Sequence, residues 1–220
     1  MPQTIYKIIT PRTIIRCYEE NDAPALTEAL LDSNAHLREW LSFAETDQWK
    51  VEDQVAKIRA WRSGFEEDRD QVFGIFDRSN HQFIGSVGYH KRVGAGGIEI
   101  GYWTRISRIR QGFMTEAVKA LIKLAFEYYL YDRVEIHCQT GNLASAAIPK
   151  KLGFEWEATL KKRVLMSTGY KDLSIFSLFR EDYGKVAEWE NFKIDGFDQA
   201  GYHQFPFILR FGELDACCGL

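Results

Sequence analysis

The chain has 220 residues, of which 45% are hydrophobic, and a formal net charge of −3 at pH 7. This length and apolar content suit one domain with a sizeable core. The negative charge argues against a nucleic-acid-binding protein that relies on bulk positive charge. The first residues lack the apolar core of a signal peptide, no apolar run predicts a membrane span, and the four cysteines show no metal-ligand spacing. We therefore expect a cytoplasmic protein with no metal, no nucleic-acid partner and no membrane contact.

The first third of the chain predicts two short strands followed by two helices. Asn21-Asp22 is expected to cap the first helix, which carries Pro24 in its first turn. The expected elements are strands at 5–9 and 13–18 and helices at about 22–33 and 51–64. The segment that joins the two helices is rich in large apolar residues, which ordinary core packing explains.

Three strands joined by hairpins follow, at 71–76, 82–90 and 98–103. In the third strand, Ile98, Ile100 and Tyr102 alternate with more polar or smaller neighbours, a period of two residues. After it, residues 114–129 place apolar side chains three and four positions apart, which predicts a long helix with one apolar face.

The junction between this strand and this helix predicts an anion site. The first turn of a helix leaves backbone N–H groups without partners and carries partial positive charge. Gly112 lets an anion approach the backbone, and Arg108 and Arg110 add positive charge. No Gly-Lys-Ser/Thr follows, which excludes a nucleoside-triphosphate loop, and only one of the three glycines of a dinucleotide fingerprint is present. A structural turn with a solvated basic loop is the alternative.

The second half of the chain predicts a strand, a short helix and two final strands. The helix follows Asn142, carries Pro149 and stops at Gly153. The expected strands are 133–138, 155–160 and 174–179, with Gly169–Asp172 as a loop before the last.

Two motifs in this order resemble the GNAT acetyltransferase superfamily. Gly112-Phe113-Met114-Thr115-Glu116-Ala117 resembles its pyrophosphate-binding loop, in the form found in ribosomal-protein N-terminal acetyltransferases, although Ile109 and Met114 depart from the strict pattern. Asn142-x-x-Ser145, followed eight residues later by Gly153-Phe154, resembles the second signature. The resemblance covers roughly residues 10–182.

The resemblance implies an α/β (α+β) fold with acetyl-CoA as cofactor. Its sheet is mixed and mostly antiparallel, has helices on both faces, and splays between its fourth and fifth strands, here 98–103 and 133–138. Residues 1–183 would form this domain. The coenzyme-binding residues that it implies are Ile100, Gly101, Tyr102, Arg108, Arg110, Gln111, Gly112, Phe113, Met114, Thr115, Asn142 and Ser145.

Three residues are candidates for catalysis. Glu99 lies beside the expected cleft and would take a proton through water, or it is a solvated edge residue. Ser145 would donate a hydrogen bond to the departing sulfur, and Asn142 would bond the pantetheine arm or a water, but both also suit a helix cap. His90 and His137 are further candidate bases.

The expected reaction transfers an acetyl group to a primary amine by direct attack in a ternary complex. In the resemblance, Trp40 belongs to the acceptor wall and Tyr170 helps to orient the acceptor; Val164 stands where the ribosomal-protein branch has a glutamate, so that role is not carried over. With no clear strong base, the α-amine of a protein N-terminus is favoured over a lysine. A polyamine, an amino acid or an antibiotic amine remains open as acceptor, and a non-catalytic acyl-CoA-binding module is the alternative function.

Residues 184–220 extend beyond the resemblance. They are net negative and rich in aromatic side chains, too apolar for a disordered tail. We expect this extension to pack on the domain or on a second copy, so a homodimer is possible.

Overall fold

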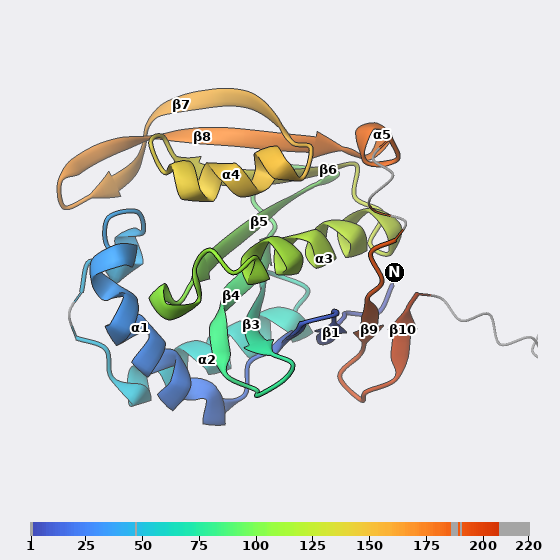
Figure 1. Ribbon diagram of the computed structural model, residues 1–220, viewed down its shortest axis with the longest axis horizontal. Helices are drawn as coiled ribbons and strands as arrows, with labels where there is room; N and C mark the ends of the chain where they lie inside the picture. The colour runs from blue at the N-terminus through green and yellow to red at the C-terminus, as the bar shows by residue number, and fades with distance from the viewer. Residues whose placement is uncertain (1, 47, 186–188, 190, 207–220) are drawn as a thin grey trace, which may run out of the picture.

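One sheet of ten strands organises the part of the chain that the computed structural model describes, residues 2–46, 48–185, 189 and 191–206 (Figure 1). Neighbouring strands are antiparallel except β5 and β6, which run parallel. Their order across the sheet is β10-β9-β1-β2-β3-β4-β5-β6-β8-β7. The strands are β1 (Lys7–Ile9), β2 (Thr13–Cys17), β3 (Gln71–Asp77), β4 (Phe83–His90), β5 (Gly97–Thr104), β6 (Arg133–Gln139), β7 (Glu155–Met166), β8 (Gly169–Phe179), β9 (Asp195–Phe197) and β10 (His203–Phe205).

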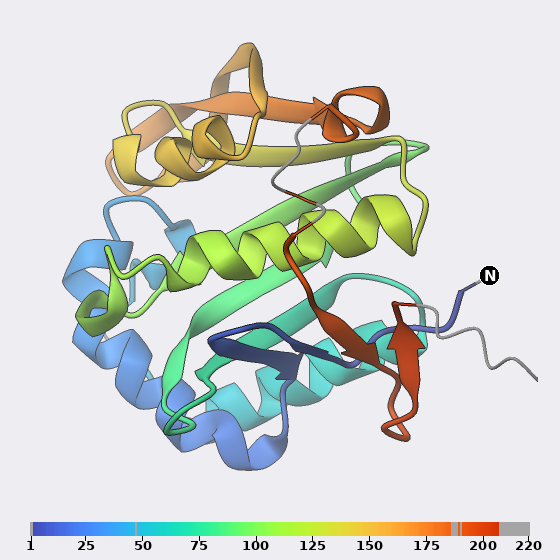
Figure 2. The ribbon, with the colours of Figure 1, turned by 45° about the vertical axis from the view of Figure 1, so that its right-hand side comes forward.

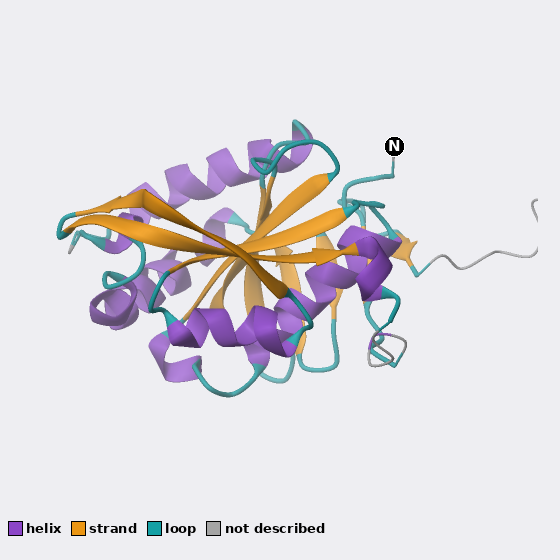
Figure 3. Ribbon diagram, turned by 90° about the horizontal axis from the view of Figure 1, so that it is seen from above, coloured by secondary structure: helices purple, strands orange, loops and turns teal. Residues whose placement is uncertain are grey.

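Helices cover both faces of this sheet, as Figure 3 shows from above. The α-helices are α1 (Ala23–Leu37), α2 (Val51–Glu66), α3 (Phe113–Glu127), α4 (Leu143–Lys151) and α5 (Arg180–Tyr183); short 3-10 helices are η1 (Glu20–Asp22), η2 (Ser42–Ala44) and η3 (Ile106–Arg108). Strand alternation explains the two layers: on β5, Tyr102 packs with the α3 cluster and Trp103 with the cluster that contains α1. The predicted arrangement is confirmed. None of the described helices is long and apolar enough to cross a bilayer.

The predicted splay lies between β5 and β6. These parallel strands pair only from Gly97 to Glu99 on β5 and from Arg133 to Glu135 on β6. Beyond Glu99, β5 continues for five residues along β4 alone. The sheet therefore opens into a V whose apex is at Glu99.

The first helix begins where the sequence predicts, but Asp22 does not cap it. Its carboxylate instead accepts two hydrogen bonds from Arg16, both 2.7 Å, and one from the Glu19 amide at 2.8 Å. No side-chain cap bond is found at this helix start. An arginine on a neighbouring strand competes better for the carboxylate than the helix amides, because that pair is bidentate and charge-assisted. The helix also continues to Leu37, past the predicted end at Ser33.

The expected loop at Gly169–Asp172 is wrong, because these residues begin β8. The last two strands form one long hairpin, with Met166 paired to Gly169 at its tip. Its pairing is irregular: Leu160 faces Leu173 and Val164 faces Lys171, so three residues of β7 oppose one of β8. This three-residue bulge interrupts the alternation of side chains between the two faces of the sheet. The period-two pattern in the sequence therefore stops at residue 160.

The described part of the extension packs back on the domain. Strand β9 pairs with β1, and β10 pairs with β9, so two strands lie beside the N-terminal one (Figure 2). Trp189, Ile194 and Phe205 are buried in the main core cluster. Two of the acidic residues that make this extension net negative, Glu188 and Glu190, lie outside the described residues, as does everything from residue 207 onward.

Candidate active site

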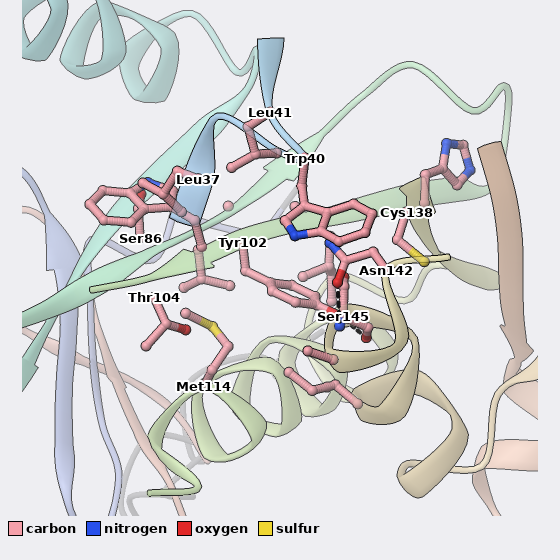
Figure 4. A pocket seen from close by; sticks show the side chains of 18 of the residues that line it. Leu37, Trp40, Leu41, Ser86, Tyr102, Thr104, Met114, Cys138, Asn142 and Ser145 are labelled. Carbon is pink, nitrogen blue, oxygen red and sulfur yellow. Dashed lines mark hydrogen bonds between the residues drawn. The ribbon is translucent and has the colours of Figure 1, made fainter. Parts of the chain in front are cut away.

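A cleft of about 1320 Å³ occupies the V between β5 and β6 (Figure 4). It is lined by the start of α3, the outer half of β5, the end of β6, the first turns of α4 and the segment after α1. Side chains from both layers therefore meet in one cavity, because the sheet does not close between them.

The start of α3 leaves main-chain amides without partners, as the predicted anion site requires. Gly112 is the residue before the helix and has φ = 81°, a left-handed conformation that favours glycine. No side chain caps the helix among the described residues. Its first amides therefore remain available to a ligand in the cleft, which Gly112, Met114 and Thr115 line.

Arg12 supports the start of α3 from outside the cleft lining, although no sequence motif points to it. It lies in the turn between β1 and β2, and its Nη1 donates to the Gln111 carbonyl at 3.0 Å. Its Nε is 2.6 Å from Glu116 Oε2, in the first turn of α3, and Glu116 Oε1 also accepts from Thr10 Oγ1 at 2.6 Å. Glu116 thus fixes α3 to the β1–β2 turn. A Cβ on Gly112 would lie 3.3 Å from Arg12 Nη2, so a side chain there would fill the space beside the guanidinium.

The two predicted arginines differ in what they contact. Arg108 donates to Gln82 and lies 3.5 Å from Asp77 Oδ2, so its charge is partly used within the protein. Arg110 lines the cleft, is exposed, and has no hydrogen bond or ion pair with the described residues. Of the other predicted coenzyme residues in this loop, Gln111 bonds the Ser107 carbonyl and Phe113 lies under Arg12; neither lines the cleft.

The outer half of β5 forms one wall. Ile100, Gly101 and Tyr102, predicted to bind the coenzyme, line the cleft. They lie beyond the last residue that pairs with β6. This backbone therefore presents a free strand edge to whatever fills the V. A Cβ on Gly101 would be 3.0 Å from His90 Nε2, so the glycine makes room for that imidazole.

A hydrogen bond joins β5 to α4 across the gap. Tyr102 Oη donates to the Ser145 carbonyl at 2.9 Å, and Ser145 Oγ lies 3.4 Å from the same Oη. In a regular helix the Ser145 carbonyl would accept from residue 149, but Pro149 has no N–H. The proline therefore frees the carbonyl that Tyr102 binds. Burial raises the pKa of Tyr102 well above its usual value, so its hydroxyl stays protonated and can donate.

Asn142 and Cys138 complete the α4 side of the cleft. Asn142 Oδ1 accepts from the Ser145 amide at 3.0 Å, so it caps α4, as the second interpretation of this residue predicts (Figure 4). Cys138 lines the cleft from the end of β6, and burial raises the pKa of its thiol. A thiol held neutral is a poor nucleophile.

Glu99 lies at the apex of the V and is not a solvated edge residue, because only 2% of its surface is exposed. Its two oxygens accept from Arg92, each at 2.6 Å. The imidazole of His137 lies between two carboxylates, with Nδ1 3.4 Å from Glu99 Oε2 and Nε2 2.6 Å from Glu135 Oε2. Glu99, Arg92 and His137 all line the cleft. The cluster can hold or relay a proton beside the bound ligands.

The segment after α1 closes the opposite wall. Trp40 lines the cleft with Leu37 and Leu41, and its carbonyl accepts from Gln139 Nε2 at 2.7 Å, which ties this wall to β6 (Figure 4). The tip of the β7–β8 hairpin contacts the same segment, because Glu45 accepts from the Ser167 amide at 2.8 Å and from Ser167 Oγ at 2.6 Å. We call this contact the Glu45–Ser167 clasp.

Tyr170, expected to orient the acceptor, is 62% exposed and does not line the cleft.

Comparison with known proteins decides the family. The family model for the acetyltransferase (GNAT) domain matches residues 12–155, more than half of the chain. The chain belongs to the GNAT acetyltransferase family. It is an N-acetyltransferase of that family, and the V-shaped cleft is its candidate active site.

Similar proteins agree with this assignment. The probable N-acetyltransferase YjcK of Bacillus subtilis is 29% identical over 139 residues, which cover 62% of this chain and 76% of that protein. The ribosomal-protein-serine acetyltransferase of Escherichia coli is 22% identical over 72% of this chain and 87% of its own length. The crystal structure of a probable acetyltransferase superimposes with a TM-score of 0.73 and 27% identity, covering 78% of this chain and 95% of its own.

The GNAT signatures predicted the α3 start and Asn142–Ser145 but not their supports. Arg12 acts through Gln111, 99 residues away in the sequence, Arg92 acts through Glu99 on the next strand, and Pro149 acts through its missing N–H. Of these three residues, Pro149 alone could be recognised from the sequence, because a proline inside a predicted helix leaves one carbonyl free.

Proposed function

We propose that the protein transfers an acetyl group from acetyl-CoA to the α-amine of a protein N-terminus, by direct attack while both substrates are bound. One observation carries the proposal. The uncapped start of α3 and the aromatic wall at Trp40 line the same cleft, with the free edge of β5 between them. Two ligands that enter from opposite layers would therefore meet beside Tyr102. The similarity to a ribosomal-protein-serine acetyltransferase supports this acceptor class.

The residues at the α3 start fit a diphosphate. The amides that follow Gly112, together with Arg110, would hold it, and the main chain of Ile100–Tyr102 would bond the amides of the pantetheine arm as an added strand does. Acetyl-CoA, when bound, supplies an activated acetyl thioester. Holding both reactants in place can account for about 7–11 kcal/mol of the barrier in fully oriented systems.

Glu99 and His137 would receive the proton that the amine loses. Arg92 bonds both oxygens of Glu99, and His137 Nδ1 lies 3.4 Å from Glu99 Oε2. We therefore place the proton between Glu99 Oε2 and His137 Nδ1, with a water completing the path from the amine. Ser145 would donate a hydrogen bond to the departing sulfur. Because burial raises the pKa of Cys138, direct attack is favoured over an acetyl-cysteine route.

The acceptor's own pKa favours an α-amine. An α-amino group titrates near 7.7–8.0 and a lysine near 10.4, so presenting a neutral lysine at pH 7 costs roughly 3.4 kcal/mol more. Glu99 is the sole carboxylate among the described residues that line the cleft, and it is already paired with Arg92. A site of this kind suits the less basic amine.

A matched set of acceptors tests the proposal. The protein is incubated with acetyl-CoA and one of three substrates: a peptide with a free N-terminus and no lysine, the same peptide with a blocked N-terminus and one lysine, or spermidine. We expect thiol release with the first alone, and mass spectrometry to place the acetyl group on the α-amine. Acetylation of the lysine peptide or spermidine at an equal rate would contradict the acceptor assignment, and no thiol release with any amine would contradict the transfer itself.

A further inference from the structure

The charges of the cleft oppose those of the whole chain. The chain carries a net charge of −3, but the cleft lining, within the described part of the chain, contains one carboxylate, Glu99, which Arg92 neutralises. The lysines and arginines of the lining are Lys57, Arg92, Arg108, Arg110, Lys151 and Arg163. Arg108 and Arg110 lie beside the start of α3, where phosphates are expected. Arg92 pairs with Glu99, but the positive charge of Lys57, Lys151 and Arg163 has no such explanation.

Arg163 belongs to the three-residue bulge of β7, which consists of Lys161, Lys162 and Arg163. The bulge has a defined backbone: Lys162 has φ = 56°, and its amide donates to Asp172 Oδ1 at 2.8 Å. Asp172 therefore holds three consecutive cations away from the ladder.

All three bulge side chains are exposed, and none forms an ion pair with the described residues. Two carboxylates of the hairpin region have other partners, because Asp172 binds the Lys162 amide and Glu45 binds Ser167. Unpaired cations at a fixed bulge keep their charge available for a ligand.

The bulge lies on the acceptor side. Arg163 lines the cleft together with Val164 and Leu173, and the tip of the same hairpin is held against the segment that carries Trp40 by the Glu45–Ser167 clasp. A chain whose amine reaches the V past Trp40 would run along this hairpin. A polycation such as spermidine would meet like charges there.

We propose that the acceptor is the N-terminal segment of an acidic polypeptide, whose carboxylates a few residues after the reacting amine pair with Arg163, Lys161 and Lys162. This inference rests on the proposed function and names the chemical class of its acceptor. Nucleic acid is a poorer candidate, because the net negative charge of the chain opposes a long phosphate backbone.

Three peptides that share a free N-terminal serine and differ at the third to fifth positions test this. These positions carry Asp/Glu, Asn/Gln or Lys. We expect kcat/KM for the acidic peptide to exceed that for the amide peptide about tenfold, through KM, because two or three exposed ion pairs each contribute a few-fold. The Arg163→Glu and Lys161→Glu variants should each lose most of this preference. Arg163→Lys should keep it, and Lys193→Glu, at an exposed lysine outside the cleft, is the matched control.

Peptide binding, measured by fluorescence anisotropy with coenzyme A present, gives a second readout that needs no turnover. If no peptide is acetylated but the acidic one binds more tightly and Arg163→Glu abolishes the difference, the proposed acetyl transfer fails, whereas the bulge is still the binding site of an acidic peptide. Equal KM and equal affinity for the acidic and amide peptides would overturn it. So would displacement of the acidic peptide by single-stranded RNA of equal charge, which would assign the bulge to polyanions in general.

Discussion

The two ends of the cleft are built in different ways. At the α3 start, the groups that would hold a ligand are main-chain amides of consecutive residues, released by one glycine at φ = 81°. At the acceptor end, the walls come from the segment after α1, the end of β6 and the β7–β8 hairpin, held together by side chains such as Gln139 and Glu45. The first end is a property of local sequence, whereas the second exists only after distant segments have met. Changes at the first end should therefore act on coenzyme binding, and changes at the second on the acceptor.

The largest effect is expected at Gly112. Gly112→Asp places a side chain next to Arg12 and a negative charge against the phosphates. Because like charges in contact repel strongly, we expect acetyl-CoA affinity to fall roughly 100-fold or more. Isothermal titration measures it. Gly94→Asp is the matched control, because Gly94 also has a positive φ and no atom lies within 4 Å of the point that a Cβ would occupy. Coenzyme affinity equal to the parent's would show that α3 does not bind the diphosphate.

Glu99→Gln should lower turnover about 100-fold with little change in coenzyme affinity, because it removes the carboxylate that lies 3.4 Å from His137 Nδ1 and that we propose to share the amine's proton with it. The pH dependence of kcat/KM should change as well. Glu135→Gln alters the other carboxylate on His137, which does not line the cleft, and should cost much less. Equal losses in both variants would shift the role from Glu99 to the orientation of His137.

Ser145→Ala should lower turnover about tenfold and leave acetyl-CoA affinity within a few-fold, since one hydrogen bond to the leaving sulfur is lost. The main-chain amide and carbonyl of residue 145 keep their bonds to Asn142 and Tyr102. Stopped-flow turnover and titration separate the two quantities, with Ser174→Ala as a control outside the cleft. Unchanged turnover would leave Ser145 with no part in the chemistry.

Pro149→Ala restores an N–H that competes with Tyr102 for the Ser145 carbonyl. We expect turnover to fall about threefold while thermal stability stays equal or rises, because proline inside a helix is unfavourable. The turnover of the double variant, Pro149→Ala with Tyr102→Phe, should be no lower than that of Tyr102→Phe alone, because both changes act on the same hydrogen bond. Additive losses in the double variant would show that proline and tyrosine act independently.

The smallest effect is expected at the Glu45–Ser167 clasp. Glu45→Gln should raise the acceptor KM two- to threefold and leave coenzyme affinity unchanged, as is usual for an exposed charged contact. Hydrogen bonds from Ser167 lower the pKa of Glu45 from its ordinary value of 4.5. The clasp is therefore intact above that value and is lost as the pH falls through the lowered pKa. The Ser167 amide resonance should follow this titration, and a resonance that does not move would exclude the contact in solution.

The sequence predicted the elements that local rules control. Period-two alternation in β5, the apolar face of α3 and the stop at Gly153, which has φ = 83°, are all present. Local rules failed where a group on another element competed for the same atoms. Asp22, expected as a cap, is bound by Arg16 instead, and the bulge of β7 hid a strand twice as long as predicted.

The same distinction holds within the site. Gly112 and Ser145 could be predicted as residues of the cleft because each belongs to a motif of neighbouring residues. The burial of Glu99 and the role of Arg12 could not, because each depends on a contact between segments that only the fold brings together. Tyr170 shows the converse, since a residue placed by motif similarity alone lies outside the cleft.

Strand β9 has a consequence for the order of folding. During synthesis the outer border of β1 has no hydrogen-bonding neighbour until residues 195–197 have left the ribosome, although the cleft and most of the core are encoded upstream. An unpaired border of this kind attracts other chains. The nascent protein therefore stays open to mispairing until β9 is made, and shortening the chain before residue 195 would expose this border of β1 and promote self-association.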